Sequence, residues 1–371
     1  MIAIARNRSN FVLRSGHEGD SSSGAVIQED MVLTREQSNG MKGYAILLIM
    51  IHNFVDHLMG IGCNEMAYSP SATADFVTMA TSQPSVWHFF SFTGWIGVAL
   101  FLFVSGYGLT RKYGHGIDHK PGFIRRHTVK LLLLLIPVYL LYVVVQHYWC
   151  GEPHNWQSVI AQLTFTINLL SYGDNGFVIE PGVYWFFGAI LQFYLLFLSI
   201  RRWRASWLII AMACAIVLQY IFLYFTNDDT MWWFRQNCIG WGAPFLLGMI
   251  AARSSWQPTK SSLLLLCATS LILLFISLGN KPLMPFTEVF TILFFGSLVL
   301  MLNLRIINAI GVISASIFVI HPFVRMTFYK AFENSELGVT PMIVIYFVTV
   351  MLLSVVHFWF YRKFSTKENM P

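Results

Sequence analysis

The sequence predicts an all-α membrane protein that crosses the bilayer about ten times and has no soluble domain. Of its 371 residues, 56% are hydrophobic and only 11% are charged, whereas a soluble domain carries about 25% charged residues. The mean hydropathy is +0.59. Apolar runs of about 20 residues, the length of a membrane-spanning helix, recur from residue 43 to residue 361.

We expect ten membrane-spanning helices, each an apolar run with polar or basic residues at its ends. Their ranges are roughly 41–60, 88–109, 129–147, 183–200, 205–225, 238–253, 262–279, 285–303, 310–329 and 341–361. The apolar segment 158–170 is too short to cross the bilayer, so it is expected to be interfacial or re-entrant.

One helical membrane domain is therefore expected over residues 41–363. Residues 1–40 are polar and rich in Ser and Gly near residue 22, and they lack the apolar core of a cleavable signal peptide. We expect them to form a disordered cytoplasmic tail; the alternative is that the part before Met31 is an upstream extension, since Met31 would also make a natural start. Residues 364–371 are expected to form a short cytoplasmic tail.

Basic residues are concentrated in alternate loops. The long loops 61–87 and 148–182 contain no Lys or Arg. By the positive-inside rule, both termini are cytoplasmic and these two acidic loops are external, in a protein of the cell (inner) membrane. The net charge of +6 is thus explained by topology and does not indicate nucleic-acid binding. The basic residues of the cytoplasmic loops are Arg111, Lys112, Lys120, Arg125, Arg126, Arg201, Arg202, Arg204, Arg253, Lys260, Arg305, Arg362, Lys363 and Lys367.

The first span carries ionisable groups where each costs about 2.5 to 3.5 kcal/mol in hydrocarbon. Lys42 belongs at the cytoplasmic boundary, and His52 lies beyond mid-membrane. Asp56 follows His52 by four positions and shares its helix face, so it is expected to orient the imidazole as a general base. His57 is expected to be an interfacial residue.

Two further groups of residues have both a structural and a functional interpretation. Arg125 and Arg126 belong to a basic loop that topology alone explains, but that loop would also bind a polyphosphate. His321 and Arg325 are four apart in the ninth span, next to Pro322, where a kink is expected. They are either packing residues or part of a site.

The five cysteines match no metal motif, and no metal site is expected. Cys63 and Cys150 both fall in external loops, so a disulfide between them is possible.

Several segments, taken in order, resemble the integral-membrane acyltransferases of acyltransferase family 3, which includes O-acetyltransferases of exported glycans. The first helix opens with Lys and Gly and ends in a histidine. An aromatic Ser-Gly-Tyr segment and the basic entry at Arg125 and Arg126 follow. The segments are LTREQSNGMKGYAILLIMIHN, FLFVSGYGL, WFFGAILQFYLLF, IGWGAPFLLGM and IHPF. His52 follows Lys42 by ten positions, and Asn53 occupies the eleventh, where the family usually has its histidine.

The resemblance implies transfer of an acyl group, most often acetyl, from cytoplasmic acyl-CoA to a glycan hydroxyl, with membrane lipid as the remaining partner and no permanently bound cofactor. It implies that Lys42, Arg125 and Arg126 bind the CoA phosphates and that the pantetheine arm passes Ser105 in the second span. His52 would be the base or the acyl carrier.

The remaining roles concern the thioester and the acceptor. His321 or Arg325 would stabilise the oxyanion. Aromatic residues of the external loops would bind the sugar; these are Tyr68, Trp87, Trp149, Trp156 and Tyr172.

Two other functions fit the same pattern. A permease for a small polar solute or a polysaccharide would also have about ten spans, Gly- and Pro-interrupted helices and intramembrane ionisable residues. A relative that senses or scaffolds without turnover is the third alternative. The oligomeric state is left open.

Overall fold

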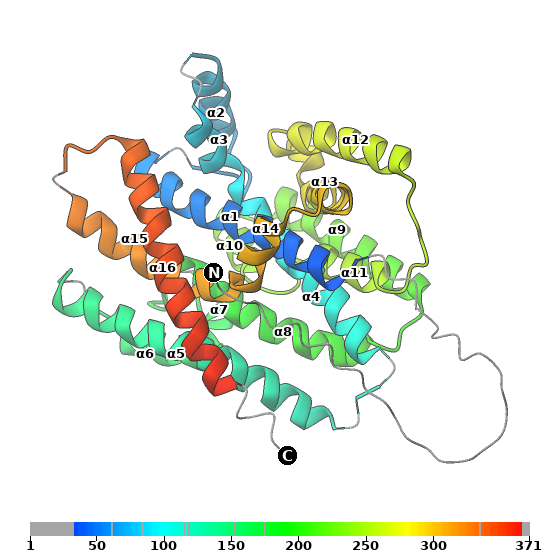
Figure 1. Cartoon of the computed structure of the whole chain (residues 1–371), viewed down its shortest axis with the longest axis horizontal. Coiled ribbons are helices and arrows are strands. Elements are labelled where there is room, and N and C mark those ends of the chain that lie inside the picture. Colours follow the sequence, from blue (N-terminus) through cyan, green and yellow to red (C-terminus); the bar gives the residue numbers. More distant parts are fainter. Residues whose placement is uncertain are drawn as a thin grey trace, which may run out of the picture. The chain divides into compact units, whose positions relative to one another are not determined.

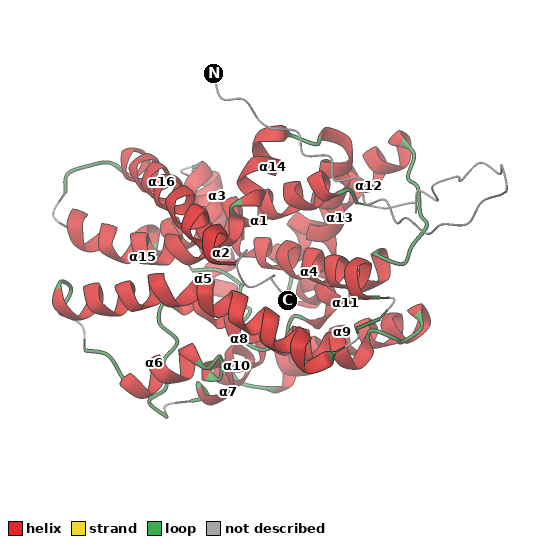
Figure 2. Ribbon diagram, turned by 60° about the horizontal axis from the view of Figure 1, so that its bottom comes forward, coloured by secondary structure: helices red, strands yellow, loops and turns green. Residues whose placement is uncertain are grey.

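The computed structural model describes residues 33–365 except 61, 83–84, 115, 118, 152, 174 and 334. All regular structure in this part of the chain is helical, as Figures 1 and 2 show. The predicted all-α membrane fold is confirmed.

Nine long helices form the body of the fold. They are α1 (Arg35–Met59), α4 (Gly97–Tyr113), α5 (Lys120–Tyr148), α8 (Trp185–Ile200), α9 (Ala205–Phe225), α12 (Lys260–Leu278), α13 (Thr287–Leu302), α15 (Ser314–Phe332) and α16 (Val339–Ser365). The shorter helices are α2 (Pro70–Ser82), α3 (Val86–Thr93), α6 (Trp156–Leu163), α7 (Ile167–Leu170), α10 (Asp228–Arg235), α11 (Gly242–Ala251) and α14 (Arg305–Val312), with 3-10 turns at Gly94–Ile96 (η1), Gly182–Tyr184 (η2) and Lys281–Phe286 (η3).

Each of the ten predicted ranges overlaps a helix. Within the described residues, seven helical stretches are long and apolar enough to cross a membrane, and the bent pair α14–α15 makes an eighth if counted as one span. The other two ranges correspond to α1, which is long but carries polar groups, and to α11, which is short. The seven stretches are Val86–Tyr113, Lys120–Tyr148, Gly182–Ile200, Ala205–Phe225, Lys260–Leu278, Lys281–Leu302 and Val339–Ser365.

Two predictions about the helices need correction: the start of the first helix and the position of the bend in the ninth span. α1 begins at Arg35, not at residue 41, because Thr34 and Gln37 form a capping box in which each side chain bonds the other's backbone N–H. Residues 35–40 are therefore helical and not part of a tail, while residues 1–32 and 366–371 lie outside the described part. The sharp bend of the ninth span, 72°, lies between α14 and α15, and α15 continues through Pro322.

α1 occupies the centre of the bundle, with α15 and α16 on one side and α13 on the other (Figure 1). Glycines allow this close packing. A Cβ on Gly43 would lie 2.1 Å from the carbonyl oxygen of Ile307, and one on Gly311 would lie 1.8 Å from that of Asn39. Since these contacts would be steric clashes, α14 can cross α1 this closely only at glycine.

The second and sixth predicted spans pack by the same device. A Cβ on Gly106 of α4 would lie 2.1 Å from the carbonyl oxygen of Phe245, and one on Gly248 of α11 would lie 2.1 Å from that of Phe103. Gly106 and Gly248 therefore serve helix packing. Gly108 differs, because a Cβ there would meet no atom within 4 Å.

The segment 158–170 forms two short helices, α6 and α7, neither of which is long enough to cross a bilayer. They lie beside α10 at one edge of the bundle (Figure 2). A polar network joins them to it, since the Asn168 amide donates to the carbonyl oxygens of Trp185 and Gln236.

Candidate active site

His52 is buried in the middle of the bundle, with 3% of its surface exposed. Its Nδ1 lies 2.7 Å from the backbone carbonyl oxygen of Ser91. Because a carbonyl only accepts hydrogen bonds, Nδ1 carries a proton, and in the neutral ring Nε2 has the lone pair. The imidazole is thus held as the tautomer that a general base requires.

Asp56 does not contact the ring as the four-residue spacing predicted. Its carboxylate accepts a hydrogen bond of 3.0 Å from the Ser91 hydroxyl, and the Ser91 carbonyl contacts His52. The backbone carbonyl of Ser91 in α3, and not Asp56, therefore orients the imidazole. The sequence of α1 alone cannot predict this contact. Asp56 holds Ser91, and Ser91 holds His52.

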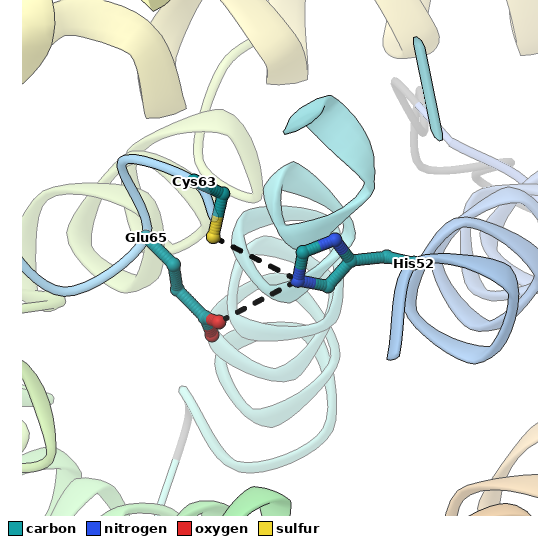
Figure 3. Close-up of side chains that lie close together, drawn as sticks. All are labelled: His52, Cys63 and Glu65. Carbon is teal, nitrogen blue, oxygen red and sulfur yellow. Dashed lines mark hydrogen bonds and ion pairs between the residues drawn. The ribbon is translucent and has the colours of Figure 1, made fainter. Parts of the chain in front are cut away.

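Two residues of the loop after α1 complete the site (Figure 3). The Cys63 Sγ lies 4.0 Å and the Glu65 Oε2 3.8 Å from His52 Nε2. Burial raises the pKa of the Cys63 thiol, so at neutral pH the thiol is protonated and donates to Nε2. Neither residue was predicted as a site residue, because a loop has no periodicity; the only signal was an external cysteine close to the end of the first span.

The loop that carries Cys63 and Glu65 is firmly held. Asn64, between them, is fully buried and donates to Thr73 Oγ1 and to the Leu278 carbonyl oxygen, at 3.0 and 2.9 Å. The Arg235 guanidinium donates to the Glu65 carbonyl oxygen at 3.1 Å. It also forms a buried ion pair with Glu288, so the loop position depends on α10 and α13.

His52 faces a cavity of about 600 Å³ that Cys63, Glu65 and Asp56 also line. A neighbouring cavity of about 460 Å³ shares several lining residues with it. The shared residues are Asn53, Glu65, Met66 and Trp232. Aromatic and polar side chains line the second cavity; they include Phe177, Trp185, Asp229, Trp233 and Gln236.

The aromatic residues predicted for sugar binding largely lie elsewhere. Of the five, only Tyr68 lines either cavity. Trp149, Trp156 and Tyr172 are at least half exposed, and the Trp87 indole donates to Thr340. The aromatic lining comes instead from Phe177 in the loop 148–182, from Trp185 at the start of α8, and from Trp232 and Trp233 of α10.

The predicted pair on α15 lies next to α1. Arg325 Nη1 donates to both the backbone oxygen and the side-chain oxygen of Asn53, each at 3.2 Å. His321 is fully buried. Two buried nitrogens of this pair, His321 Nε2 and Arg325 Nε, have no hydrogen-bond partner. Unpaired buried polar atoms are costly, by about 1–3 kcal/mol each, so they indicate a place where a ligand would bind.

The depth of His321 follows from how α1 and α15 run. Arg325 meets Asn53, and the Tyr329 ring stacks on that of His57, with the same offset in residue number. The two helices therefore run parallel and in step, and His321 lies near the level of Ile49. That is about one turn from His52, toward Lys42.

At the other end of α1, Lys42 lines a cavity of about 670 Å³. Three further basic side chains line it, from the start of α1 and the ends of α4 and α16: Arg35, Arg111 and Arg362. The tyrosines Tyr107 and Tyr361 add hydroxyl groups. This cavity shares no lining residue with the one at His52.

The predicted partners of Lys42 are not in this cavity. Arg125 and Arg126 are exposed on the first turns of α5 and line none of the cavities described above. The Ser105 hydroxyl donates to the Phe101 carbonyl oxygen of its own helix, at 2.8 Å. Arg111, in the last turn of α4, lines the cavity with Lys42. It takes the place that was predicted for the basic residues at the start of α5.

Comparison with known families identifies the chain. A family model described as an acyltransferase domain matches residues 35–359, which is most of the chain and the whole of the helical bundle up to α16. The chain belongs to acyltransferase family 3. No curated protein and no solved structure matches it.

As a member of acyltransferase family 3, the protein is a multi-pass membrane acyltransferase, and this favours the predicted transferase over the permease. The family places a histidine at the end of the first helix, and this chain has His52 and Asn53 there. Of the two, His52 faces the buried loop residues, and Asn53 faces α15.

One set of side chains in this acyltransferase has the geometry to hold a metal ion. The ligand atoms of His52, Cys63 and Glu65 lie within 4.8 Å of one another. The sequence had indicated no metal. The same three side chains form the contacts to His52 Nε2 described above.

Proposed function

We propose that the protein takes a short acyl group, acetyl in the simplest case, from cytoplasmic acyl-CoA and transfers it to a hydroxyl of an exported glycan. One observation carries the proposal: α1 lines a basic cavity at Lys42 and a separate, aromatic and acidic cavity at His52. A single central helix thus connects two chemically different sites, one at each end.

The basic cavity suits the donor. CoA carries a 3′-phosphate and a pyrophosphate, and these anions are bound best by several cationic side chains that converge. Lys42, Arg35, Arg111 and Arg362 converge at the end of the bundle that the positive-inside rule assigns to the cytoplasm. The donor site is therefore proposed here and not at Arg125 and Arg126.

The two cavities at the other end of α1, the one at His52 and the aromatic one next to it, suit the acceptor. Carbohydrates stack their apolar faces on aromatic rings and bond their hydroxyls to polar side chains, and Trp232, Trp233 and Gln236 provide both. His52 Nε2 faces this space with its lone pair, and it takes the proton of the attacking hydroxyl. Asp56 acts only through Ser91.

The unpaired nitrogens of α15 suit the thioester. Arg325 Nε is a buried donor and His321 Nε2 a buried acceptor, and neither atom has a hydrogen-bond partner. A carbonyl oxygen that becomes an oxyanion needs such fixed donors in a water-poor site. We assign this role to Arg325; His321, whose Nδ1 donates to the Ile317 carbonyl oxygen at 3.1 Å, accepts at Nε2 and is not an oxyanion donor.

The short acyl group is inferred from the packing. A Cβ on Gly94 would lie 2.5 Å from the His52 Cβ, so α1 and η1 leave no space for a long chain beside the ring. The apolar cavity among α4, α11 and α13, of about 220 Å³, shares no residue with the His52 cavity. Among the cavities of the described residues, this apolar one is thus separate from the site at His52, which favours a short acyl group.

The donor must bridge the distance between the two cavities. Lys42 and His52 are separated by about 15 Å along the helix axis, at 1.5 Å per residue. The phosphopantetheine arm of CoA is of this length when extended. The proposal therefore places the phosphates at Lys42 and the thioester near His321.

A vesicle assay tests this function. The full-length protein is reconstituted into liposomes that enclose a mixture of oligosaccharides, and radiolabelled acetyl-CoA is added outside. We expect labelled oligosaccharide inside the vesicles with wild-type protein, and a loss of about 100- to 10,000-fold with His52→Ala, the range for a general base. Vesicles in which wild-type protein and His52→Ala give equal label would contradict the proposal.

A further inference from the structure

The loop after α1 places a thiol beside the lone pair of a buried imidazole. The Cys63 Sγ is 4.0 Å from His52 Nε2, and the opposite ring nitrogen is bonded to the Ser91 carbonyl oxygen (Figure 3). A thiol that donates to a base, which is itself oriented by a third group, has the arrangement of an activated nucleophile. Nothing in the proposed function so far uses this thiol.

The arrangement is built into the fold on both sides. On the ring side, the close contact of Gly94 with the His52 Cβ fixes the position of the imidazole. On the thiol side, the buried Asn64 amide and the Arg235 guanidinium hold the loop through three hydrogen bonds to other elements. Such anchoring would have no purpose for a loop that merely connects α1 to α2.

The thiol also lies where an acyl group would meet the acceptor. Cys63 lines the cavity of about 600 Å³, which shares the lining residues Glu65 and Trp232 with the aromatic cavity. It carries a free thiol, so the disulfide with Cys150 considered from the sequence is not formed. A group bound to Sγ would therefore be presented to the acceptor side of the molecule.

We propose that Cys63 is a catalytic nucleophile that carries the acyl group as a thioester between the donor and the acceptor. This inference rests on the proposed function and names its intermediate. The transfer then takes place in two half-reactions, and CoA leaves before the acceptor hydroxyl attacks.

In the first half-reaction, His52 Nε2 takes the proton of the Cys63 thiol, and Sγ attacks the carbonyl carbon of acyl-CoA. The new bond joins Sγ to this carbon, the bond to the CoA sulfur breaks, and the CoA thiolate takes the proton from His52. One thioester replaces another, so the step needs no further reactant.

In the second half-reaction, His52 takes the proton of the acceptor hydroxyl, whose oxygen attacks the acyl carbon. An ester forms, the bond to Sγ breaks, and the Cys63 thiolate recovers the proton. Glu65, 3.8 Å from Nε2, stabilises the imidazolium that forms in each half. Glu65 is a positioning and charge-stabilising residue and forms no bond.

The test is to trap the acyl-enzyme. Purified full-length protein is incubated with radiolabelled acetyl-CoA without acceptor, quenched in acid, and digested for mass spectrometry. We expect up to one acetyl group per chain on Cys63, released by neutral hydroxylamine as thioesters are. Cys63→Ala is expected to carry no label and to lose transfer, whereas the control Cys267→Ala, on α12, is labelled like the wild type.

Folding is checked separately, because Cys63 is half-buried. Cys63→Ser keeps the size and polarity of the side chain, and it should retain the wild-type melting temperature and its increase with acetyl-CoA while transfer falls. With wild-type protein, the double-reciprocal rate plots at several acceptor concentrations should be parallel, as for a ping-pong reaction.

Four results would overturn the proposal. They are Cys63→Ala that transfers acetyl at the wild-type rate, label found on His52 alone, active wild-type protein that never becomes labelled, and stoichiometric zinc that Cys63→Ala no longer binds. In each of these cases acetyl transfer by the wild type can still be measured, so the proposed function stands. Wild-type protein that transfers no acetyl from acetyl-CoA would overturn both.

Discussion

Asn53 and Arg325 join α1 to α15: one guanidinium nitrogen donates to both the backbone and the side-chain oxygen of Asn53, each at 3.2 Å. Asn53 therefore points to α15, while its neighbour His52 points to Cys63 and Glu65. Consecutive residues of a helix differ in direction by about 100°. For the proposed reaction, this would explain how a histidine one position earlier than usual in the family can serve as the base.

The exchange of these two residues tests that explanation. In the double variant His52→Asn/Asn53→His, the imidazole would face Arg325 and have neither the Ser91 carbonyl nor Cys63 beside it. We expect acyl transfer to stay as low as in His52→Ala. Recovery of wild-type transfer by the exchange would show that the histidine works equally well from the α15 side.

A second prediction concerns Asp56. Because Asp56 reaches His52 only through the Ser91 hydroxyl, Asp56→Ala removes one hydrogen bond and leaves the Ser91 carbonyl in place. A typical hydrogen bond contributes about 0.5–1.5 kcal/mol, which corresponds to at most about a tenfold loss of rate. A loss as large as that of His52→Ala, measured in the same transfer assay, would instead mean a direct contact between carboxylate and imidazole.

The third prediction concerns the buried pair that anchors the loop. Glu288 accepts from Arg235 and from Gln219, and all three side chains are buried. Glu288→Ala leaves Arg235 as an uncompensated buried charge, at a cost of about 3–5 kcal/mol. We expect a clearly lower melting temperature and, because Arg235 bonds the Glu65 carbonyl oxygen, lower transfer at temperatures where the protein is folded.

The isosteric variant provides the control. Glu288→Gln keeps an acceptor for Arg235 and the same volume, so its melting temperature should fall between those of the wild type and Glu288→Ala. If Glu288→Ala melted like the wild type, the ion pair would not anchor the fold.

The sequence predicted the helices and the position of His52 well, because both depend on properties of a single segment. Apolar runs identify spans, and an ionisable group within one must face the protein interior. The beginning of α1 was missed, although the capping box of Thr34 and Gln37 was readable, because the polar first turns lack the apolar pattern.

Contacts between segments could not be predicted. Cys63 and Glu65 lie beside His52 in a loop that distant residues hold, among them Leu278 and Arg235. Likewise Arg35, Arg111 and the C-terminal part of α16 meet at Lys42 because the helix ends coincide in space. Asp56 follows His52 by one helical turn, as predicted, but the His52 imidazole bonds the Ser91 carbonyl oxygen of α3 and not the carboxylate.

The fourth prediction concerns the contact of α1 with η1. A Cβ on Gly94 would lie 2.5 Å from the His52 Cβ and 2.6 Å from the Leu48 carbonyl oxygen. Gly94→Ala should therefore push α1 away, lowering both transfer and the melting temperature. Gly296→Ala, on α13, is the matched control, since a Cβ there meets nothing within 4 Å and alanine is the better helix former by about 0.5–1 kcal/mol. Equal effects of the two variants would contradict the close contact.

The last prediction locates the donor phosphates. Lys42 and Arg35 line the basic cavity, whereas Arg125 and Arg126 are exposed on α5. The double variants Lys42→Ala/Arg35→Ala and Arg125→Ala/Arg126→Ala each remove two positive charges, so they change the net charge equally. Only the first pair should weaken binding of acetyl-CoA.

Hydrogen bonds to charged groups contribute about 1.5–3 kcal/mol, and each 1.4 kcal/mol is about a factor of ten in Kd. Titration calorimetry in detergent should therefore give a Kd at least about tenfold higher for the cavity pair, and a Kd close to that of the wild type for the α5 pair. The opposite ranking would return the phosphates to the basic entry of α5, and the cavity at Lys42 would then need another ligand.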